Sequence, residues 1–378
     1  MKNKLRILHA YKFYYPFEGG IPTIIKQITQ GLKLQTHQEV LTTHTKFFGR
    51  NEMIDDISVC RLGSYGELFS LPLTPHYPAV LWKQAHDFDI VDYHFPMPWV
   101  DAAVALYWPK RTKLIVHWHS KIISQTKIAH MLQPMIQRCL KRADRIVVAD
   151  SDHIMQSPWL DKFKEKCVVI PHGINSDDWQ NLNTYERNQI SHLQKNHGRY
   201  ILAVGRLVDY KGFPVLIKAM QQVMPHYKLL IVGEGCLETK LKLLVEKLKL
   251  NERVHFCGRV SHQQLKCLYH GSDLFALPSI TENESFGIVQ LEAMACAKPI
   301  VNTRLNSAVP LVARHEQEAL TVSPNSPDEL AIAINKVLSD HELGQFLGIK
   351  GRQRVQTIFS EKKFLNDTLE LYNSLYQN

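Results

Sequence analysis

The chain has 378 residues, of which 45% are hydrophobic and 21% are charged. This length exceeds one compact core, so two domains of ordinary size are expected, and the composition excludes disordered and fibrous classes. The formal net charge of +9 is compatible with nucleic acids, anionic membranes or anionic small substrates as partners. The sequence has no recognised nucleic-acid module and no concentrated basic stripe, which argues against a nucleic-acid-binding protein.

Cysteines and apolar stretches indicate the compartment. Seven cysteines occur without a C-x-x-C pair or metal-finger spacing, which favours reduced thiols scattered through a core and therefore a cytoplasmic protein. The longest uncharged stretch, residues 68–82, contains three prolines that would interrupt a membrane-spanning helix. The first residues hold too few apolar side chains for a secretory signal and are better explained as an opening strand. We therefore expect no membrane span.

The first half of the chain alternates short β-rich runs with helical patterns. After Gly19-Gly20, apolar residues recur at helical spacing, and a further helix is expected over residues 122–143. This rhythm predicts a parallel sheet with helical crossovers. The expected strands are 5–10, 89–94, 113–119, 145–150 and 167–171.

A polar segment, residues 176–199, interrupts the rhythm and is the expected linker. A second alternation follows, and the tail from Asp328 is helical. We therefore predict an α/β protein with two doubly wound, Rossmann-like domains facing a central cleft, formed by residues 1–175 and 200–359, with a C-terminal helix, 360–378, packing back on the first. The expected strands of the second domain are 200–205, 228–233, 254–258, 273–278 and 299–303.

In such sheets, ligands bind beyond the carboxyl ends of the strands, so the turns there form the candidate site. One helix is expected to begin near Phe286, and the free N–H groups of its first turn would favour a phosphate. Arg206 ends an earlier strand and Lys211 precedes the next helix; two cations and a helix N-terminus suit a diphosphate without a metal. No G-x-G-x-x-G follows any expected strand, which argues against an NAD-dependent dehydrogenase. The N–H groups of that first turn belong to Gly287, Ile288 and Val289.

Two glutamates flank this helix start. Glu292 lies inside the helix among apolar residues, where ribose hydroxyls are a natural partner for its carboxylate. Glu284 lies on the loop side and could meet sugar hydroxyls beyond the phosphates, with Glu282 as a competitor. Alternatively, Glu292 pairs with a basic residue of a neighbouring helix and Glu284 caps the helix, which is the commoner explanation for either acid alone. The nucleotide-sugar hypothesis depends on their combination with the two cations.

The stretch PSITENESFGIVQLEAMACAKPI (278–300) carries an E-x7-E motif formed by Glu284 and Glu292, and FEGGI, GRLVDYKG, LLIVGEG and VHFCGRV precede it in order. With these motifs the chain resembles the retaining glycosyltransferases of family 4, which have the two-domain GT-B fold. The resemblance covers nearly the whole chain. VHWHSKIISQ, ADRIVVADS and VIPHGI are similar to segments of bacterial mannosyl- and rhamnosyltransferases of lipopolysaccharide and exopolysaccharide assembly.

This resemblance implies a set of donor contacts. Arg206 and Lys211 would hold the donor diphosphate, Glu284 the donor-sugar hydroxyls and Glu292 the ribose. The backbone of 286–288 would contact phosphate and sugar. The remaining implied positions are Gly20, which would approach the phosphates from the other domain, and the base-bordering residues Gly233, Glu234, Arg259 and Val260.

A histidine is also implied near the reaction. His119 resembles the family histidine that contacts a donor hydroxyl near the anomeric centre. Strand alternation alone cannot choose between His117 and His119, because both lie on one face of the strand. His94 ends the preceding expected strand and is a candidate for an acceptor contact, although strand-end histidines are usually hydrogen-bonded scaffold.

The resemblance implies transfer with retention at the anomeric carbon and no metal or other cofactor. We identify no carboxylate for a double displacement, so front-face attack is expected, with the leaving phosphate taking the acceptor's proton. The expected donor is GDP-mannose or a GDP-deoxyhexose; a UDP-sugar, or a synthase acting on a small sugar acceptor, are the alternatives. The expected acceptor is a polyprenyl-diphosphate-linked glycan or a polysaccharide.

Basic and aromatic residues in the predicted acceptor domain favour an anionic membrane surface as a partner, at the inner face of the plasma membrane. Trp108, Trp159 and Phe163 stand beside lysines and arginines in the sequence. The alternative is that the basic residues form solvated helix faces and these aromatic residues turn inward.

Overall fold

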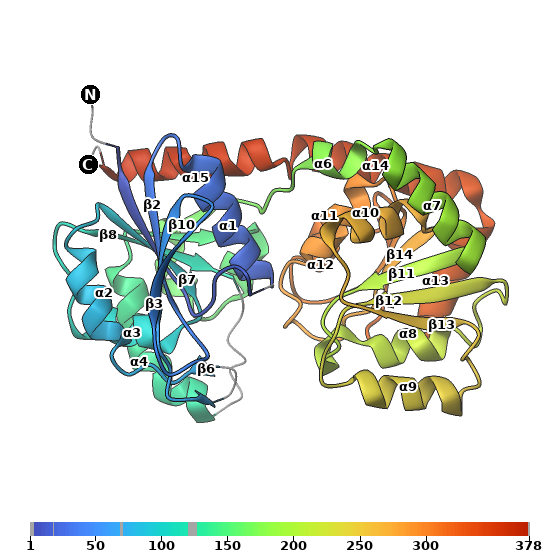
Figure 1. Cartoon of the computed structure of the whole chain (residues 1–378), viewed down its shortest axis with the longest axis horizontal. Coiled ribbons are helices and arrows are strands. Elements are labelled where there is room, and N and C mark those ends of the chain that lie inside the picture. The colour runs from blue at the N-terminus through green and yellow to red at the C-terminus, as the bar shows by residue number, and fades with distance from the viewer. Residues whose placement is uncertain (1–3, 18, 69–70, 120–126, 377–378) are drawn as a thin grey trace. The chain divides into compact units, whose positions relative to one another are not determined.

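The computed structural model describes residues 4–17, 19–68, 71–119 and 127–376, without the side chains of 127–131, 153 and 156. The chain forms two compact units. In each unit, a mainly parallel sheet is covered by helices on both faces (Figure 1). The first unit comprises Met1–His172 and Phe364–Asn378, and the second comprises Gly173–Lys363.

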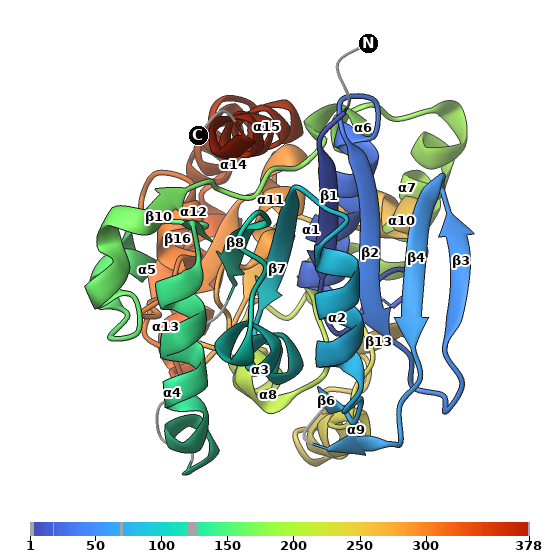
Figure 2. The ribbon, with the colours of Figure 1, turned by 90° about the vertical axis from the view of Figure 1, so that its left-hand side faces the viewer.

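The first unit is built on eight strands among the described residues. They are β1 (Arg6–Ala10), β2 (His37–Thr43), β3 (Arg50–Ile54), β4 (Ile57–Leu62), β7 (Ile90–Phe95), β8 (Lys113–Trp118), β9 (Arg145–Val148) and β10 (Cys167–Val169). Figure 2 shows their order across the sheet, β10-β9-β8-β7-β1-β2-β4-β3, in which only β3 runs antiparallel to its neighbour. A separate hairpin joins β5 (Glu67–Leu68) to β6 (Leu71–Pro72).

Helices cover both faces of this sheet, so its central strands are buried throughout. All six residues of β7 are buried, as expected for a parallel strand covered on both faces. An ideal Cβ on Gly31 would lie 2.3 Å from Leu365 Cδ1, so α1 and α15 pack at close range. The helices are α1 (Gly20–Leu32), α2 (Tyr77–Ala85), α3 (Pro98–Leu106), α4 (Lys127–Arg142), α5 (Ser151–Gln156), the 3-10 helix η1 (Asp161–Lys166) and α15 (Glu361–Tyr376).

The second unit contains a six-stranded sheet whose paired strands are all parallel. Its strands are β11 (Arg199–Val204), β12 (Tyr227–Val232), β13 (Val254–Gly258), β14 (Leu274–Leu277), β15 (Ile300–Thr303) and β16 (Ala319–Val322), in the order β13-β12-β11-β14-β15-β16. Its helices are α6 (Ser176–Gln180), α7 (Thr184–His197), the 3-10 helix η2 (Asp209–Lys211), α8 (Phe213–Ala219), α9 (Glu238–Lys247), α10 (His262–Gly271), α11 (Ile288–Ala295), α12 (Val309–Val312), α13 (Pro327–Ser339) and α14 (His341–Thr357).

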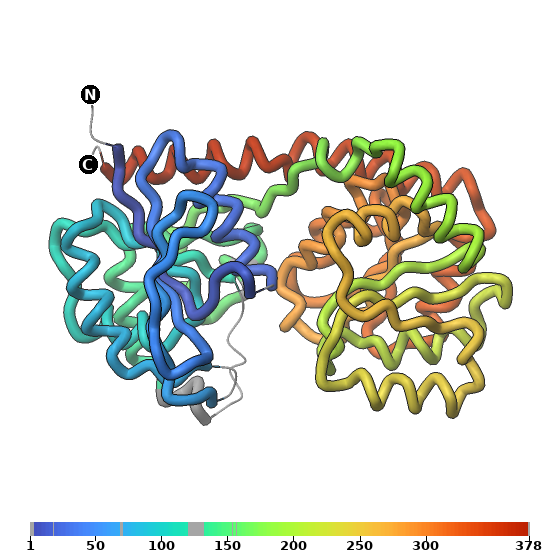
Figure 3. The backbone as a smooth tube through the Cα atoms, in the orientation of Figure 1, coloured from blue at the N-terminus to red at the C-terminus, as the bar shows by residue number. Residues whose placement is uncertain are grey.

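The path of the chain creates a switch point in each sheet (Figure 3). In the second unit the chain runs from β11 outward to β13 and then returns to β14 on the other side of β11. In the first unit it runs from β1 outward and returns to β7 beside β1. The carboxyl ends of β11 and β14, and those of β1 and β7, are therefore where a doubly wound sheet binds ligands.

The predicted α/β class with two doubly wound sheets is confirmed, but several elements differ. Strands β2, β3, β4 and β16 were not predicted. The first five residues of the predicted helix 122–143 lie outside the described residues, and α4 ends one residue before the predicted end.

Residues 176–199, the expected linker, form α6, α7 and the start of β11. Their polarity has a local explanation, because Asn183 and Glu186 make a capping box at the start of α7. Buried Glu186 also accepts a hydrogen bond from Lys266 Nζ at 3.1 Å, which ties α7 to α10. A capped and ion-paired helix can be as polar as a linker.

Trp108 and Trp159 are buried in the core of the first unit, and Phe163 packs against that core. The prediction that these residues contact a membrane is therefore wrong, and the alternative of inward-facing aromatic residues holds. Across the described part of the chain, no helix combines the length and apolarity needed to cross a bilayer.

Candidate active site

An ion pair crosses the switch point of the second unit. Lys211 follows β11, Glu284 follows β14, and Lys211 Nζ lies 2.6 Å from Glu284 Oε2. Both side chains are buried. Ser279 Oγ also donates to Glu284 Oε2 at 2.9 Å. The sequence placed these residues at equivalent turns, and the structure brings them into contact.

Two glycines make this contact geometrically possible. Gly212 has φ 69°, and an ideal Cβ on it would lie 2.0 Å from Pro278 O, so the turn after Lys211 can pack closely on the chain leaving β14. An ideal Cβ on Gly205 would lie 3.2 Å from Lys211 Cε, so the lysine side chain passes directly over this glycine. Its ammonium is thereby directed to the carboxyl edge of β11.

The E-x7-E segment forms a glycine-capped helix start. Gly287 is the N-cap residue of α11 and has φ 71°, a conformation that favours glycine. The helix begins at Ile288, two residues after the predicted start, with Val289 in its first turn. Phe286 is buried and packs edge-to-face on Phe359, at 5.9 Å between ring centroids. This packing fixes the loop that leads to the free N–H groups of α11.

Glu292 lies in α11, and its carboxylate accepts a hydrogen bond from Tyr269 OH at 2.8 Å. The pKa of the Glu292 carboxyl is raised from 4.5 to about 7. Burial causes the rise, and this hydrogen bond and the charges of His262 and Lys211 keep it from being larger. The predicted alternatives, a basic helix partner for Glu292 and a capping role for Glu284, are not what these contacts show. Among the described residues, no cation forms an ion pair with Glu292, so its carboxyl remains available for hydroxyl groups.

Glu292 should make stability depend on pH. The folded state holds its proton more tightly than the unfolded chain, so this contribution is full below pH 4.5 and is lost as pH rises through 7. We expect Glu292→Gln to gain about 1–2 kcal/mol of stability over the wild type between pH 5 and pH 8, less than the full shift because the side chain keeps some solvent access. Urea unfolding of both proteins at pH 5 and pH 8 measures this. The same stability difference between them at the two pH values would contradict it.

The other predicted donor residues lie on neighbouring turns of the same unit. Arg206 is exposed, and its guanidinium donates to Tyr210 OH at 3.3 Å. Glu234 pairs with Arg259 at 3.4 Å, and both are exposed. Gly233 has φ 129°, and an ideal Cβ on it would lie 2.1 Å from Gly205 O, so the turns after β11 and β12 are in close contact. Val260 follows Arg259 after β13.

A buried histidine cluster occupies the switch point of the first unit. Its rings come from the adjacent strands β1, β7 and β8, from the residue after β8 and from the segment after β10, and neighbouring rings lie 4.8 to 5.7 Å apart between centroids. Asp92 and Tyr372 complete it, with the Tyr372 hydroxyl donating to Asp92 Oδ2. The histidines are His9, His94, His117, His119 and His172.

Hydrogen bonds link part of this cluster in a directed chain. Thr36 Oγ1 donates to Leu32 O at 3.0 Å and must therefore accept from Gln38 Nε2, at 2.6 Å. This orients the Gln38 amide so that its oxygen accepts from His9 Nε2, at 2.6 Å. A backbone carbonyl thus fixes the position of one proton on His9.

The donor–acceptor direction set at His9 continues through His94 to His119. Burial lowers the pKa of His9, and burial with the neighbouring histidines lowers that of His94 well below 6.5, so both rings are neutral. His9 Nδ1 then accepts from His94 Nε2 at 3.2 Å, and His94 Nδ1 accepts from His119 Nε2 at 2.9 Å. A neutral His119 accordingly carries its hydrogen on Nε2 and a lone pair on Nδ1.

Asp92 supplies the negative charge of the cluster. Burial opposes its ionisation, but His117, the Tyr372 hydroxyl and, when it is protonated, His9 lower the pKa of this carboxyl below 3.8. His117 Nε2 lies 3.2 Å from Asp92 Oδ1, whereas His9 Nδ1 lies 3.7 Å from Oδ2, beyond hydrogen-bonding distance. His9 Nδ1 is therefore free to accept from His94.

The cluster also has residue types that bind metal ions. The ligand atoms of His94, His117 and His119, and those of His9, Asp92 and His94, lie within 4.8 Å of one another. His94 belongs to both groups, and each of its ring nitrogens is already hydrogen-bonded to another histidine. Binding a metal ion would require this chain of hydrogen bonds to break.

Three members of this cluster, His94, His117 and His119, were candidates from the sequence, but its organisation was not predicted. The structure joins His119 and His94 directly, while the acceptor contact of His94 stays a prediction. Gly20 begins α1 in the same unit. Gln38 carried no signal in the sequence because β2 was not predicted.

Comparisons with known proteins show which families this chain resembles. A family model described as glycosyl transferases group 1 matches residues 185–354, and one described as glycosyltransferase family 4 matches residues 18–178. O-antigen chain mannosyltransferase C of Escherichia coli is 26% identical, over 99% of this chain and 100% of that protein. D-rhamnosyltransferase WbpZ of Pseudomonas aeruginosa is 28% identical, over 94% and 92%.

Solved structures share the fold. Sucrose-phosphate synthase from Thermosynechococcus elongatus superposes with a TM-score of 0.84 at 21% identity, over 99% of this chain and 100% of that chain. Anabaena HepE in complex with UDP superposes with a TM-score of 0.79 at 20% identity, over 98% and 100%.

The two family matches together span most of both units, and they define the chain as a glycosyltransferase. It belongs to glycosyltransferase family 4 and has the GT-B fold.

Proposed function

We propose that this glycosyltransferase is a retaining, metal-independent hexosyltransferase of cell-surface glycan biosynthesis. It moves mannose or a related deoxyhexose from a GDP-sugar to a lipid-linked or polysaccharide acceptor. The observation that carries the proposal is the buried Lys211–Glu284 pair at the switch point of the second sheet. It joins a cation suited to phosphate and a carboxylate suited to sugar hydroxyls.

Each donor group has a chemically matched partner in the second unit. Arg206 and Lys211 bind the diphosphate, assisted by the free N–H groups at the start of α11. The two described contacts of the Glu284 carboxylate both use Oε2, which leaves Oε1 for a donor-sugar hydroxyl. Glu292 binds the ribose hydroxyls in place of solvent.

The proposed reaction takes place on one face of the sugar. The bond between the anomeric carbon and the diphosphate oxygen breaks, and an acceptor oxygen bonds to that carbon on the same face. The acceptor's proton passes to the departing phosphate, whose developing charge Arg206 and Lys211 stabilise. Glu284 is held by Lys211 and Ser279, which supports a binding role for it and not a nucleophilic one.

The names of the relatives support the donor and the pathway. Two proteins that match this chain almost from end to end are called an O-antigen chain mannosyltransferase and a D-rhamnosyltransferase. Mannose and rhamnose are hexoses of related stereochemistry. We therefore favour GDP-mannose or a GDP-deoxyhexose over a UDP-sugar.

Thermal unfolding with GDP-mannose, GDP-fucose, UDP-glucose and UDP-GlcNAc tests this donor class. A donor present at 100 times its Kd should add about 2.7 kcal/mol of stability, and we expect this from a GDP-sugar. Arg206→Ala should remove most of the shift. Arg187→Ala, which replaces an exposed arginine of α7, is the control and should leave the shift intact.

Each outcome of this panel has a definite meaning. Stabilisation by a UDP-sugar alone would overturn the GDP assignment and favour the UDP alternative. An unchanged shift in Arg206→Ala would remove this arginine from the diphosphate site. If none of the four donors stabilises the protein, the proposed substrate class is wrong.

A further inference from the structure

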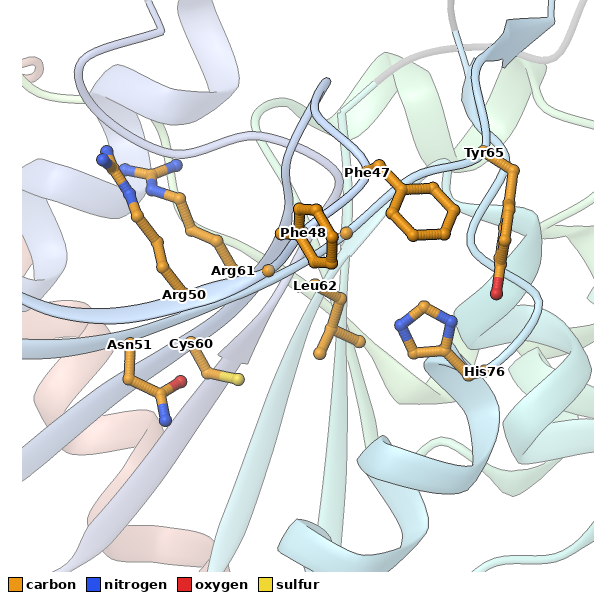
Figure 4. Close-up of a pocket in the computed structure, with 11 residues that line it drawn as sticks. Phe47, Phe48, Arg50, Asn51, Cys60, Arg61, Leu62, Tyr65 and His76 are labelled. Carbon is orange, nitrogen blue, oxygen red and sulfur yellow. The ribbon is translucent and has the colours of Figure 1, made fainter.

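A cavity of about 420 Å³ lies on the β4 side of the first unit. Its walls come from the loop between β2 and β3, the adjoining ends of β3 and β4, the loop after β4 and the residue before α2. Figure 4 shows Phe47, Tyr65 and His76 around one side of it, with the guanidinium groups of Arg50 and Arg61 together on the other. No part of the donor site uses these residues.

We propose that this cavity binds uncharged sugar residues of the acceptor glycan at a distance from the point of transfer. The proposal rests on the proposed function, because it assigns the acceptor of that same reaction. Four observations support it: the exposed aromatic rings, the rigid loops that carry them, the charge around the cavity and the position of the cavity on the sheet.

Three aromatic rings are exposed together at the mouth of the cavity. The side chains of Phe47, Phe48 and Tyr65 are 60%, 81% and 63% exposed. Phe47 contacts Phe48 and Tyr65 edge-on, at 5.1 and 5.2 Å between ring centroids. A contiguous exposed aromatic patch beside a cavity is typical of a ligand site. The apolar C–H faces of pyranose rings stack on such ring faces.

The loops that present these rings are locked together. An ideal Cβ on Gly63 would lie 1.9 Å from Phe47 O, and one on Gly49 would lie 2.5 Å from Arg61 O, so only glycine allows this packing. Ser64 N also donates to Lys46 O at 2.9 Å. The aromatic side chains are therefore held outward by the backbone.

The net charge around the cavity is small, which suits a neutral ligand. Asp55 and Asp56 lie in the turn at the far end of the β3–β4 hairpin and pair with Lys26 and Lys33. The rest of residues 44–68 contains three Lys or Arg and two Glu, a formal balance of +1.

Arg50 and Arg61 both pair with Glu52. An anionic membrane surface attracts clusters of four to eight unpaired basic residues. The Arg61 guanidinium is buried and donates to Glu52 and to the carbonyls of Tyr14 and Tyr15. Exposed Arg50, Asn51 and His76 instead offer hydrogen bonds suited to sugar hydroxyls.

The position of the cavity on the sheet sets the length of glycan that could reach it from His119. Strands β4, β2, β1, β7 and β8 are parallel, so the loops after β4 and the residue after β8, His119, leave the same edge. Four strand spacings separate β4 from β8, which is roughly 19 Å. A glycan whose end lies near His119 would need several sugar residues to reach the aromatic rings.

Aromatic-ring NMR of the full chain tests the site, with mannose, α-mannotetraose, α-rhamnotetraose and phosphatidylglycerol vesicles as probes. We expect one of the tetrasaccharides, and mannose far less, to shift the ring signals of Phe47, Phe48 and Tyr65. Phe48→Ser with Tyr65→Ser should weaken that binding at least tenfold without changing the melting temperature. The control Phe346→Ser removes a 44% exposed ring of α14 and should have no effect.

The remaining outcomes separate this inference from the proposed function. Ring signals unmoved by either tetrasaccharide, or equal binding by the double variant, would overturn the glycan site. Vesicle binding that the double variant loses would assign the surface to a membrane and also overturn it. The stabilisation by GDP-mannose is measured on the same proteins: if it persists while glycan binding fails, only the glycan site is wrong. If it is absent while glycan binding holds, only the donor assignment is wrong.

Discussion

Replacing Lys211 with alanine is expected to lower turnover by roughly 10²- to 10³-fold, the usual cost of removing one group that stabilises transition-state charge. Donor affinity should fall by less than about tenfold, because Arg206 and the N-terminus of α11 still hold the diphosphate. Turnover should fall more than affinity because negative charge develops on the phosphate only as the sugar leaves. Steady-state kinetics together with donor binding by calorimetry measure both quantities.

The control must separate catalysis from folding, because Lys211→Ala leaves the Glu284 carboxylate without its buried partner. The double variant Lys211→Ala with Glu284→Gln removes both charges and should regain stability but not turnover. Lys218→Ala, at an exposed position of α8, should match the wild type. Equal losses in turnover and in donor binding by Lys211→Ala would show that the lysine only binds.

Changing Gln38 to glutamate is expected to reverse the hydrogen-bond chain that reaches His119. A carboxylate at this position, close to Asp92, raises the pKa of His9 and stabilises its charged form. His9 Nδ1 then donates to His94 Nε2, so His94 must carry its proton on Nδ1 and donate to His119 Nε2. His119 moves its own proton to Nδ1. Nitrogen-15 NMR of the histidine rings distinguishes the two tautomers.

A second variant at the same position, Gln38→Leu, removes the amide that sets the direction of these hydrogen bonds. Gln38→Leu leaves the His9 Nε2–H group buried without an acceptor, which should cost about 1–3 kcal/mol of stability. Gln38→Glu should keep more of that stability while lowering kcat/KM about tenfold through the altered His119 tautomer. The control is Thr42→Val, which changes a buried residue of the same strand that takes no part in these hydrogen bonds. Identical histidine spectra in Gln38→Glu and the wild type would refute the directed chain.

Much of the fold followed from apolar runs that reach the core from both sides. β11 and β14 are largely apolar strands, and both were predicted within one residue at each end. β2 and β4 were not predicted because polar side chains on them point into the core. Gln38 and Arg61 are buried only because other segments supply their hydrogen-bond partners. A sequence does not record such partners, so these strands resemble loops.

The candidate site divides in the same way. Turns at strand ends predicted Lys211, Glu284 and the start of α11, because the topology alone brings such turns together. The partner of Glu292 was not predictable, since Tyr269 lies on a helix whose packing the sequence does not specify. The direction of the histidine network was equally unpredictable, because it depends on Gln38 of β2, a strand that was not predicted.

The assignment of residues 364–378 to the first unit affects how the protein is made. Residues 173–363 are continuous and can collapse while still attached to the ribosome. The first unit cannot finish before the second unit has been translated, because Tyr372, the hydroxyl donor to buried Asp92, follows that unit in the chain. Until Tyr372 has been made, the first unit holds an interior charge that lacks one of its donors, so its assembly is the later of the two.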